Sequence, residues 1–243
     1  MKPAFLVELK TSQDYMRRTF VVALIMTVLE ICALQMIGPI PGIMGSIVLV
    51  GCARSGLNNS KQGWSEAQLV MPLSRKDVVL ARYKVSLLVG FLAMLLGFVI
   101  CAAVGALASY MDVPDMDLSN LVLSTENLQV VALSSAILMM IGFIVLAFLF
   151  PMAARYGDTG AVELLPFIIW IVFLIPTVVM MSWEQIDNPA LNAVMKVMTE
   201  DFASLGNRPW DVALISGVVF ALGLLILAIS SRVAVKWYEE KDL

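Results

Sequence analysis

The chain has 243 residues, of which 60% are hydrophobic and only 14% are charged, and its formal net charge is −3. A soluble domain has about 45–50% apolar and about 25% charged residues, so this composition, with a mean hydropathy of +0.89, excludes a water-soluble domain and a disordered chain. The sequence contains no histidine, which excludes Ser-His hydrolysis and His-ligated zinc or haem. The three cysteines lie in or beside apolar blocks and are predicted to be small buried residues.

Six apolar blocks are predicted to span a membrane, because a crossing helix needs about 20 mostly apolar residues. They cover Phe20–Ile37, Pro41–Gly56, Val85–Ser109, Leu128–Pro151, Glu163–Ser182 and Asp211–Ser231. The second block is short and contains Pro41 and several glycines, so we expect it to be tilted, interrupted or extended into the following loop. The predicted fold is an all-α membrane protein with six transmembrane helices in a single domain over residues 1–243.

The segment before the first block, residues 1–19, is predicted to be an interfacial helix. Apolar residues such as Phe5, Leu6 and Leu9 alternate there with polar ones, which is typical of a helix that lies on a leaflet.

The bases predict the orientation. The N-terminal segment holds four of the 16 Lys and Arg residues, the loop between the second and third blocks six, the loop after the fourth block one and the tail three. The remaining two lie in the loop after the fifth block, residues 183–209, and the other two loops hold none. By the positive-inside rule both termini are cytoplasmic, and residues 183–209 form an extracellular loop. The location that follows is the plasma membrane of a bacterial cell, with a multi-pass topology.

The outer loops are acidic, with Asp112, Asp115 and Asp117 in one and Glu184 and Asp187 in another. Two interpretations are open: the acids steer cations to the outer face, or they are neutral consequences of a topology that excludes only bases.

The sequence contains no motif for ATP hydrolysis or for catalysis. It contains no G-x-x-x-x-G-K-[ST] loop, and no segment outside the blocks is long enough for a separate domain. We expect no catalytic residues, no metal site, no cofactor bound by this chain and no nucleic-acid partner.

The loop at residues 57–84 is the most informative segment. Trp64 begins a short amphipathic stretch that Pro72 ends, because a proline disfavours α geometry at the residue before it. Ser74 then resembles a helix N-cap, with Asp77 at the third helical position as in a capping box. A basic loop with two interfacial helices accounts for the bases, but not for an acid, a proline break and a capped restart in close order.

This loop resembles a known family. Three parts of it are similar to the signature of type-2 ABC exporter permeases: Glu66, the stretch Met71-Pro72-Leu73-Ser74-Arg75-Lys76-Asp77-Val78-Val79, and the pair Arg82-Tyr83. They resemble in particular the small six-span branch that exports amphipathic peptide toxins such as phenol-soluble modulins. Met71 and Leu73 replace the leucine and valine usual in that branch.

The resemblance implies a half-transporter. A second permease chain, expected to be identical, completes a dimer on two copies of a separate ABC ATPase subunit, which binds ATP and Mg. The loop then carries the coupling helix that docks on the ATPase. The candidate coupling residues are Trp64, Glu66, Pro72, Leu73, Ser74, Arg75, Lys76 and Asp77.

Glu30 is a candidate for the translocation path. It lies about ten residues, or about 15 Å, into the first block, where a charge costs at least about 2.5 kcal/mol and should face protein or water. It either lines the path between protomers or makes a structural hydrogen bond, for instance to Gln35 or Ser46.

The predicted function is therefore a permease subunit of an ATP-binding cassette exporter that moves an amphipathic or hydrophobic substrate, peptide or lipid-like, outward through the membrane lipid. The alternatives are a self-immunity permease that expels antimicrobial peptides and the substrate-capture subunit of a vitamin importer. An intramembrane enzyme is disfavoured, because the spans lack histidine and paired acids.

Overall fold

The computed structural model describes residues 2–34, 37–61, 74–110, 121–156 and 208–240, together with four isolated positions between 164 and 172. Helices make up these residues, and no strand occurs among them. The elements are α1 (Lys2–Thr11), α2 (Gln13–Leu29), the π-helical segment η1 (Glu30–Leu34), α3 (Ile40–Lys61), α5 (Arg75–Tyr110), α6 (Thr125–Tyr156) and α9 (Pro209–Glu239).

The long helices explain the hydropathy of the chain. Among the described helices, α5, α6 and α9 are each long and apolar enough to cross a membrane, and α3 carries a shorter apolar stretch, Ile40–Arg54. With 36 residues, α5 is about 54 Å long at about 1.5 Å per residue, which exceeds a hydrocarbon core of about 30 Å. The protein is therefore an all-α membrane protein, and α5 is longer than a membrane crossing requires.

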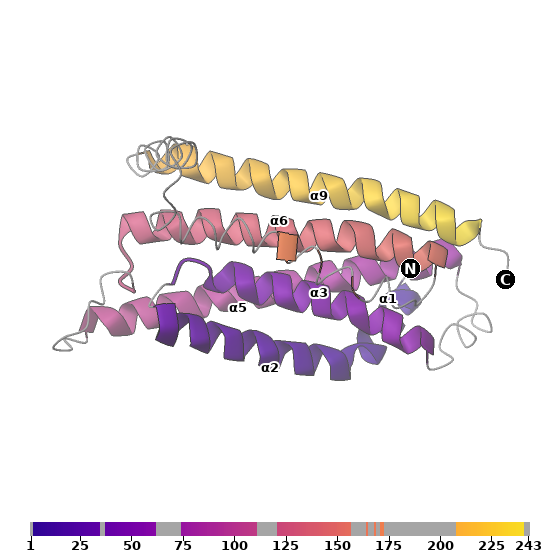
Figure 1. Cartoon of the computed structure of the whole chain (residues 1–243), viewed down its shortest axis with the longest axis horizontal. Coiled ribbons are helices and arrows are strands. Elements are labelled where there is room, and N and C mark those ends of the chain that lie inside the picture. Colours follow the sequence, from indigo (N-terminus) through magenta and orange to yellow (C-terminus); the bar gives the residue numbers. More distant parts are fainter. Residues whose placement is uncertain are drawn as a thin grey trace, which may run out of the picture.

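The helices form a bundle of nearly parallel rods (Figure 1). α6 packs against α9 and α3, and α3 packs in turn against α5 and α2. Half of the most apolar window of α6 is buried, compared with 28% for α5 and 22% for α9. The main core accordingly forms around Met139, Phe143, Leu146 and Leu149 of α6, which are fully buried.

The second predicted span is a continuous helix, and its glycines have a packing role. A Cβ atom at Gly42 would lie 2.7 Å from Cβ of Leu138 and 2.9 Å from Cα of Ser135, and one at Gly45 would lie 2.9 Å from Cβ of Met94. The glycines thus let α3 approach α5 and α6 closely, as small residues do between membrane helices. The expected interruption is absent from α3, whereas the expected extension into the loop is confirmed, because α3 continues to Lys61.

The irregular span is the first one. Residues 1–19, predicted to form one interfacial helix, belong to two helices, because α1 ends at Thr11 and α2 starts at Gln13 and continues into the first predicted span. At its far end α2 passes into the five-residue π-helix η1. Such segments are rare and widen the helix locally.

Several helix ends meet at one end of the bundle (Figure 1). This basic end comprises the starts of α2 and α5 and the ends of α3, α6 and α9, together with α1, and it carries the bases assigned above to the cytoplasm. α6 ends there, whereas α9 starts at the opposite end. In the sequence the predicted fifth span, Glu163–Ser182, follows α6 and precedes α9. Apart from the four isolated positions, it lies outside the described residues.

Candidate functional site

The first part of the site is the capped start of α5. The amide N–H of Asp77 donates a hydrogen bond to Oγ of Ser74 at 3.1 Å, and the N–H of Val78 donates to the Ser74 carbonyl at 3.2 Å. The first bond satisfies one of the N–H groups that a helix start leaves without an intrahelical partner, and the second is the first backbone hydrogen bond of the helix itself. The predicted cap at Ser74 is therefore confirmed.

The described residues contain only part of the predicted coupling segment. Ser74, Arg75, Lys76 and Asp77 form the cap and first turn of α5, with Ser74 and Lys76 exposed to solvent. Trp64, Glu66, Pro72 and Leu73 lie outside the described residues. The coupling role of the whole segment stays a prediction.

The second part is a charged contact between α1 and α5. Glu8 is only 4% exposed, and its Oε1 lies 3.9 Å from Nε of Arg82, two turns after the α5 cap. Nε of Arg82 has no hydrogen-bond partner among the described residues. The two groups therefore attract each other across a gap too long for a direct hydrogen bond.

Burial governs the Glu8 carboxyl. Desolvation raises its pKa, and the neighbouring Arg82 guanidinium lowers it by a smaller amount, so the net shift of the pKa is upward. The hydroxyl of Ser12, which is also buried, donates to the Glu8 carbonyl at 2.7 Å and closes α1 where it meets α2. A titratable group therefore lies inside the joint between α1 and α5.

The third part joins α5 to the core. The hydroxyl of Tyr83 donates to Oγ of Ser230 on α9 at 2.7 Å, and Ser230 donates to the carbonyl of Ala147 on α6, also at 2.7 Å. The Tyr83 ring lies 4.5 Å from that of Phe150. Three long helices are thus connected next to Arg82, at a distance of only a few turns from the α5 cap.

A cation–π contact adds to this connection at the basic end. The guanidinium of Arg155 on α6 lies 5.1 Å from the ring of Trp237 on α9 and 5.5 Å from that of Tyr156. Such contacts contribute about 0.5–1 kcal/mol at exposed sites, so they hold the ends of α6 and α9 together.

Glu30 lies at the junction of α2 and η1, half-buried, beside the exposed apolar residues Val28 and Leu29. No described residue makes a hydrogen bond or ion pair with its side chain. Ser46, one of the expected partners, donates instead to the carbonyl of Ile43 in its own helix, and Gln35 lies outside the described residues. Whether Glu30 lines a path stays a prediction.

The residues that sequence reasoning missed are Glu8, Ser230 and the hydroxyl role of Tyr83. Glu8 and Ser230 sit in patterns that predict solvent or lipid exposure, and their partners are remote in the sequence. Within the described residues no group of three or more His, Cys, Asp or Glu side chains is arranged to hold a metal ion.

Comparison with known proteins identifies the family of the chain. A family model described as "ABC-2 family transporter protein" matches residues 8–239, from within α1 to the end of α9. No curated protein and no solved structure matches the chain. The match confirms the resemblance to type-2 ABC permeases, while the narrower peptide-toxin branch stays a prediction. The chain belongs to the ABC-2 transporter family, the membrane permeases of ATP-binding cassette transporters, which work with an ABC ATPase partner.

Proposed function

We propose that this chain is the permease subunit of an ATP-driven exporter that moves an amphipathic or hydrophobic substrate out of a bacterial cell. The proposal rests on a series of connected contacts at the basic end. They run from the α5 cap through the Glu8–Arg82 contact to Tyr83, Ser230 and Ala147. A displacement applied to the segment before α5 has a direct route through these contacts to α1, α6 and α9.

The length of α5 supports this mechanism. Its 36 residues form one helix, so a force at Ser74 moves the whole rod rather than one turn. Tyr83 and Ser230 then transfer the movement of α5 to α9 and α6. The partner ATPase binds ATP with Mg, and its closure on ATP supplies the force. In this chain α5 transmits the movement, and the membrane helices form the path of the substrate.

An apolar face of α2 that the described residues leave exposed supports a dimer. Val22, Ile25 and Leu29 are each about half exposed on this helix, and the half-buried Glu30 carboxyl follows them. We propose that two identical permease chains and two ATPase subunits form the transporter, with Glu30 near the path between protomers. The same assembly serves a self-immunity permease, and the cargo distinguishes the two.

The test is the double variant Glu66→Ala with Arg75→Ala, studied with the partner ATPase in nanodiscs. Truncation of interface anchors costs about 2 kcal/mol or more, so we expect stimulation of the ATPase by the permease and peptide export from proteoliposomes to fall about thirtyfold. Lys236→Ala, which removes an exposed base from α9 at the same end, is the matched control. Unchanged stimulation and export in the double variant contradict the proposed coupling role.

A further inference from the structure

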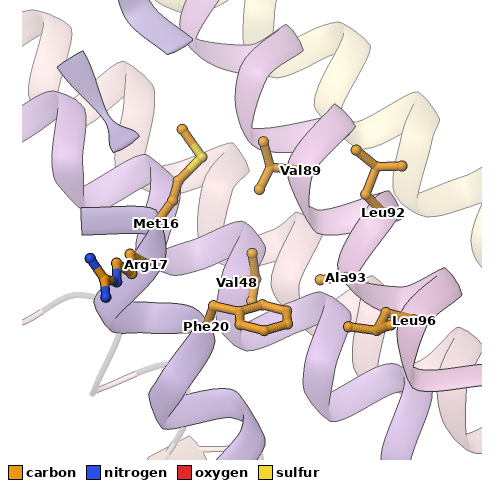
Figure 2. A pocket seen from close by; sticks show the side chains of 8 residues that line it. All are labelled: Met16, Arg17, Phe20, Val48, Val89, Leu92, Ala93 and Leu96. Carbon is orange, nitrogen blue, oxygen red and sulfur yellow. The ribbon is translucent and has the colours of Figure 1, made fainter. Parts of the chain in front are cut away.

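A groove on the outside of the bundle has no part in the proposed coupling route. It lies between α2, α3 and α5 and encloses about 380 Å³, within the range of about 300–1,000 Å³ typical of small-ligand sites. Figure 2 shows the side chains that line it, with Phe20 and Val48 at its centre and Leu96 and Leu92 towards α5.

The lining is apolar except at one place. Val48 and Ala93 are buried and form the floor, whereas Leu92 and Leu96 are 56% and 37% exposed at the rim. The groove is therefore open sideways, towards the apolar layer that surrounds the bundle. An alkyl chain that entered from the side would contact apolar side chains along the whole length of the groove.

Arg17 is the exception. It is exposed and lies at the edge of the groove, with its guanidinium directed away from the apolar side chains (Figure 2). It belongs to the first turns of α2, so it marks the end of the groove nearest the basic end. No carboxylate within the described part of the chain forms an ion pair with it. A cation without an internal counter-charge, placed beside an apolar groove, complements an anion that carries an alkyl chain.

We infer that this groove binds an anionic glycerophospholipid of the leaflet at the basic end, with one acyl chain over Val48 and Ala93 and the phosphate on Arg17. A phospholipid meets the groove from the bilayer, the side on which Leu92 and Leu96 leave it open. An amphipathic peptide helix needs apolar contact over several turns and polar partners along its other face, and Arg17 is the one polar side chain that the groove offers.

The experiment uses the full-length chain in detergent, titrated with phosphatidylglycerol or with phosphatidylcholine of the same acyl chains and analysed by native mass spectrometry. We expect one phosphatidylglycerol per chain, bound in preference to phosphatidylcholine. Arg17→Ala should weaken phosphatidylglycerol binding about fivefold, the factor that corresponds to roughly 1 kcal/mol per base near an anionic surface, and should remove the preference. Arg18→Ala is the matched control, since Arg18 is an exposed neighbouring base that does not line the groove.

A second pair of variants tests the groove without changing charge. Val89→Phe adds bulk inside it and should lower binding of both lipids, whereas Leu88→Phe, on the preceding residue of α5, which is not in the lining, should leave binding unchanged. Glycerol 1-phosphate alone should not compete, because it lacks the alkyl chain.

Three results would overturn the inference. Equal losses in Arg17→Ala and Arg18→Ala would indicate diffuse attraction to the basic end. Equal effects of Val89→Phe and Leu88→Phe would place the lipid elsewhere. Displacement of bound lipid by an amphipathic peptide, lost in Arg17→Ala, would make the groove a peptide site.

Discussion

At the basic end of the bundle Ser74 caps the start of α5, and at the opposite end Ser124 caps the start of α6. Both caps have the same geometry: Oγ of the serine accepts a hydrogen bond at 3.1 Å from the N–H three residues later, that of Asp77 in one case and that of Asn127 in the other. Their surroundings differ. Beyond Ser74 come the buried Glu8–Arg82 pair and the hydrogen bonds of Tyr83 and Ser230. Around Ser124 the helices meet through apolar and small residues.

At the opposite end the helices are held together mainly by apolar packing. Ile37, Ile40, Cys101, Leu121 and Val131 form its buried cluster. Two polar contacts accompany it among the described residues: the hydroxyl of Ser134 is shared between the carbonyls of Gly38 and Val130, each at 2.6 Å, and the thiol of Cys101 lies 3.8 Å from the carbonyl of Ile37. Mainly apolar packing constrains the relative positions of helices less than a network of polar contacts does, and the polar contacts at the basic end fix which residues of α1, α5, α6 and α9 meet. This difference is the one expected if force enters at the basic end and the opposite end opens.

The largest expected effect on stability comes from breaking the close packing of α3. Gly42→Leu places a side chain against Cα of Ser135, backbone that cannot move without moving α6. Overpacking of this kind costs about 1–3 kcal/mol or more, so we expect a clear fall in the melting temperature in detergent. Gly217→Leu is the matched control, because a Cβ atom there meets nothing within 4 Å; an equal loss in both variants would refute a packing role for Gly42.

The next effect concerns the hydrogen bonds at the basic end. Ser230→Ala leaves the Tyr83 hydroxyl without its acceptor, at a cost of about 0.6–1.7 kcal/mol, the range measured for interhelical hydrogen bonds in membranes. Tyr83→Phe removes the donor as well, so the double variant should cost less than the sum of the two single changes. Thermal unfolding of the three variants gives the coupling energy, and strictly additive losses would show that the pair does not interact.

The two caps provide a paired test of function. Ser74→Ala and Ser124→Ala should each cost about 1 kcal/mol in local helix stability, seen as faster hydrogen exchange at Asp77 and Asn127. Stimulation of the partner ATPase should fall only in Ser74→Ala, and Ser74→Asp, which keeps an acceptor, should restore it. Equal loss of stimulation in both alanine variants would remove the functional distinction between the two ends.

The sequence predicted what depends on local pattern. The continuous apolar blocks predicted the positions of α3, α5, α6 and α9. The observed helices extend beyond these blocks, by a few residues at some ends and by several turns at others. The spacing of Ser74 and Asp77 predicted the α5 cap. The sequence did not predict contacts between remote residues: Tyr83 and Ser230 are 147 positions apart. The burial of Glu8 does not follow from the pattern of residues 1–19, because it depends on the α5 surface against which α1 packs. The interruption predicted for the second span from Pro41 and the glycines was wrong, because the effect of these residues is close packing of α3.

The smallest expected effect is the pH dependence of the α1–α5 joint. Burial raises the pKa of Glu8 in the folded protein above its value in the unfolded chain, so the protonated carboxyl is the form that the fold favours. The contribution to stability is therefore fully present below the ordinary glutamate pKa, and it is lost as the pH rises through the raised pKa. Glu8→Gln mimics the protonated form and should be more stable than the wild type above that window, with the difference vanishing at acid pH. Melting temperatures of both proteins, measured from acid to neutral pH, test the sign. A variant less stable than the wild type at neutral pH would mean that attraction to Arg82 outweighs desolvation, and that the charged pair itself holds α1 on α5.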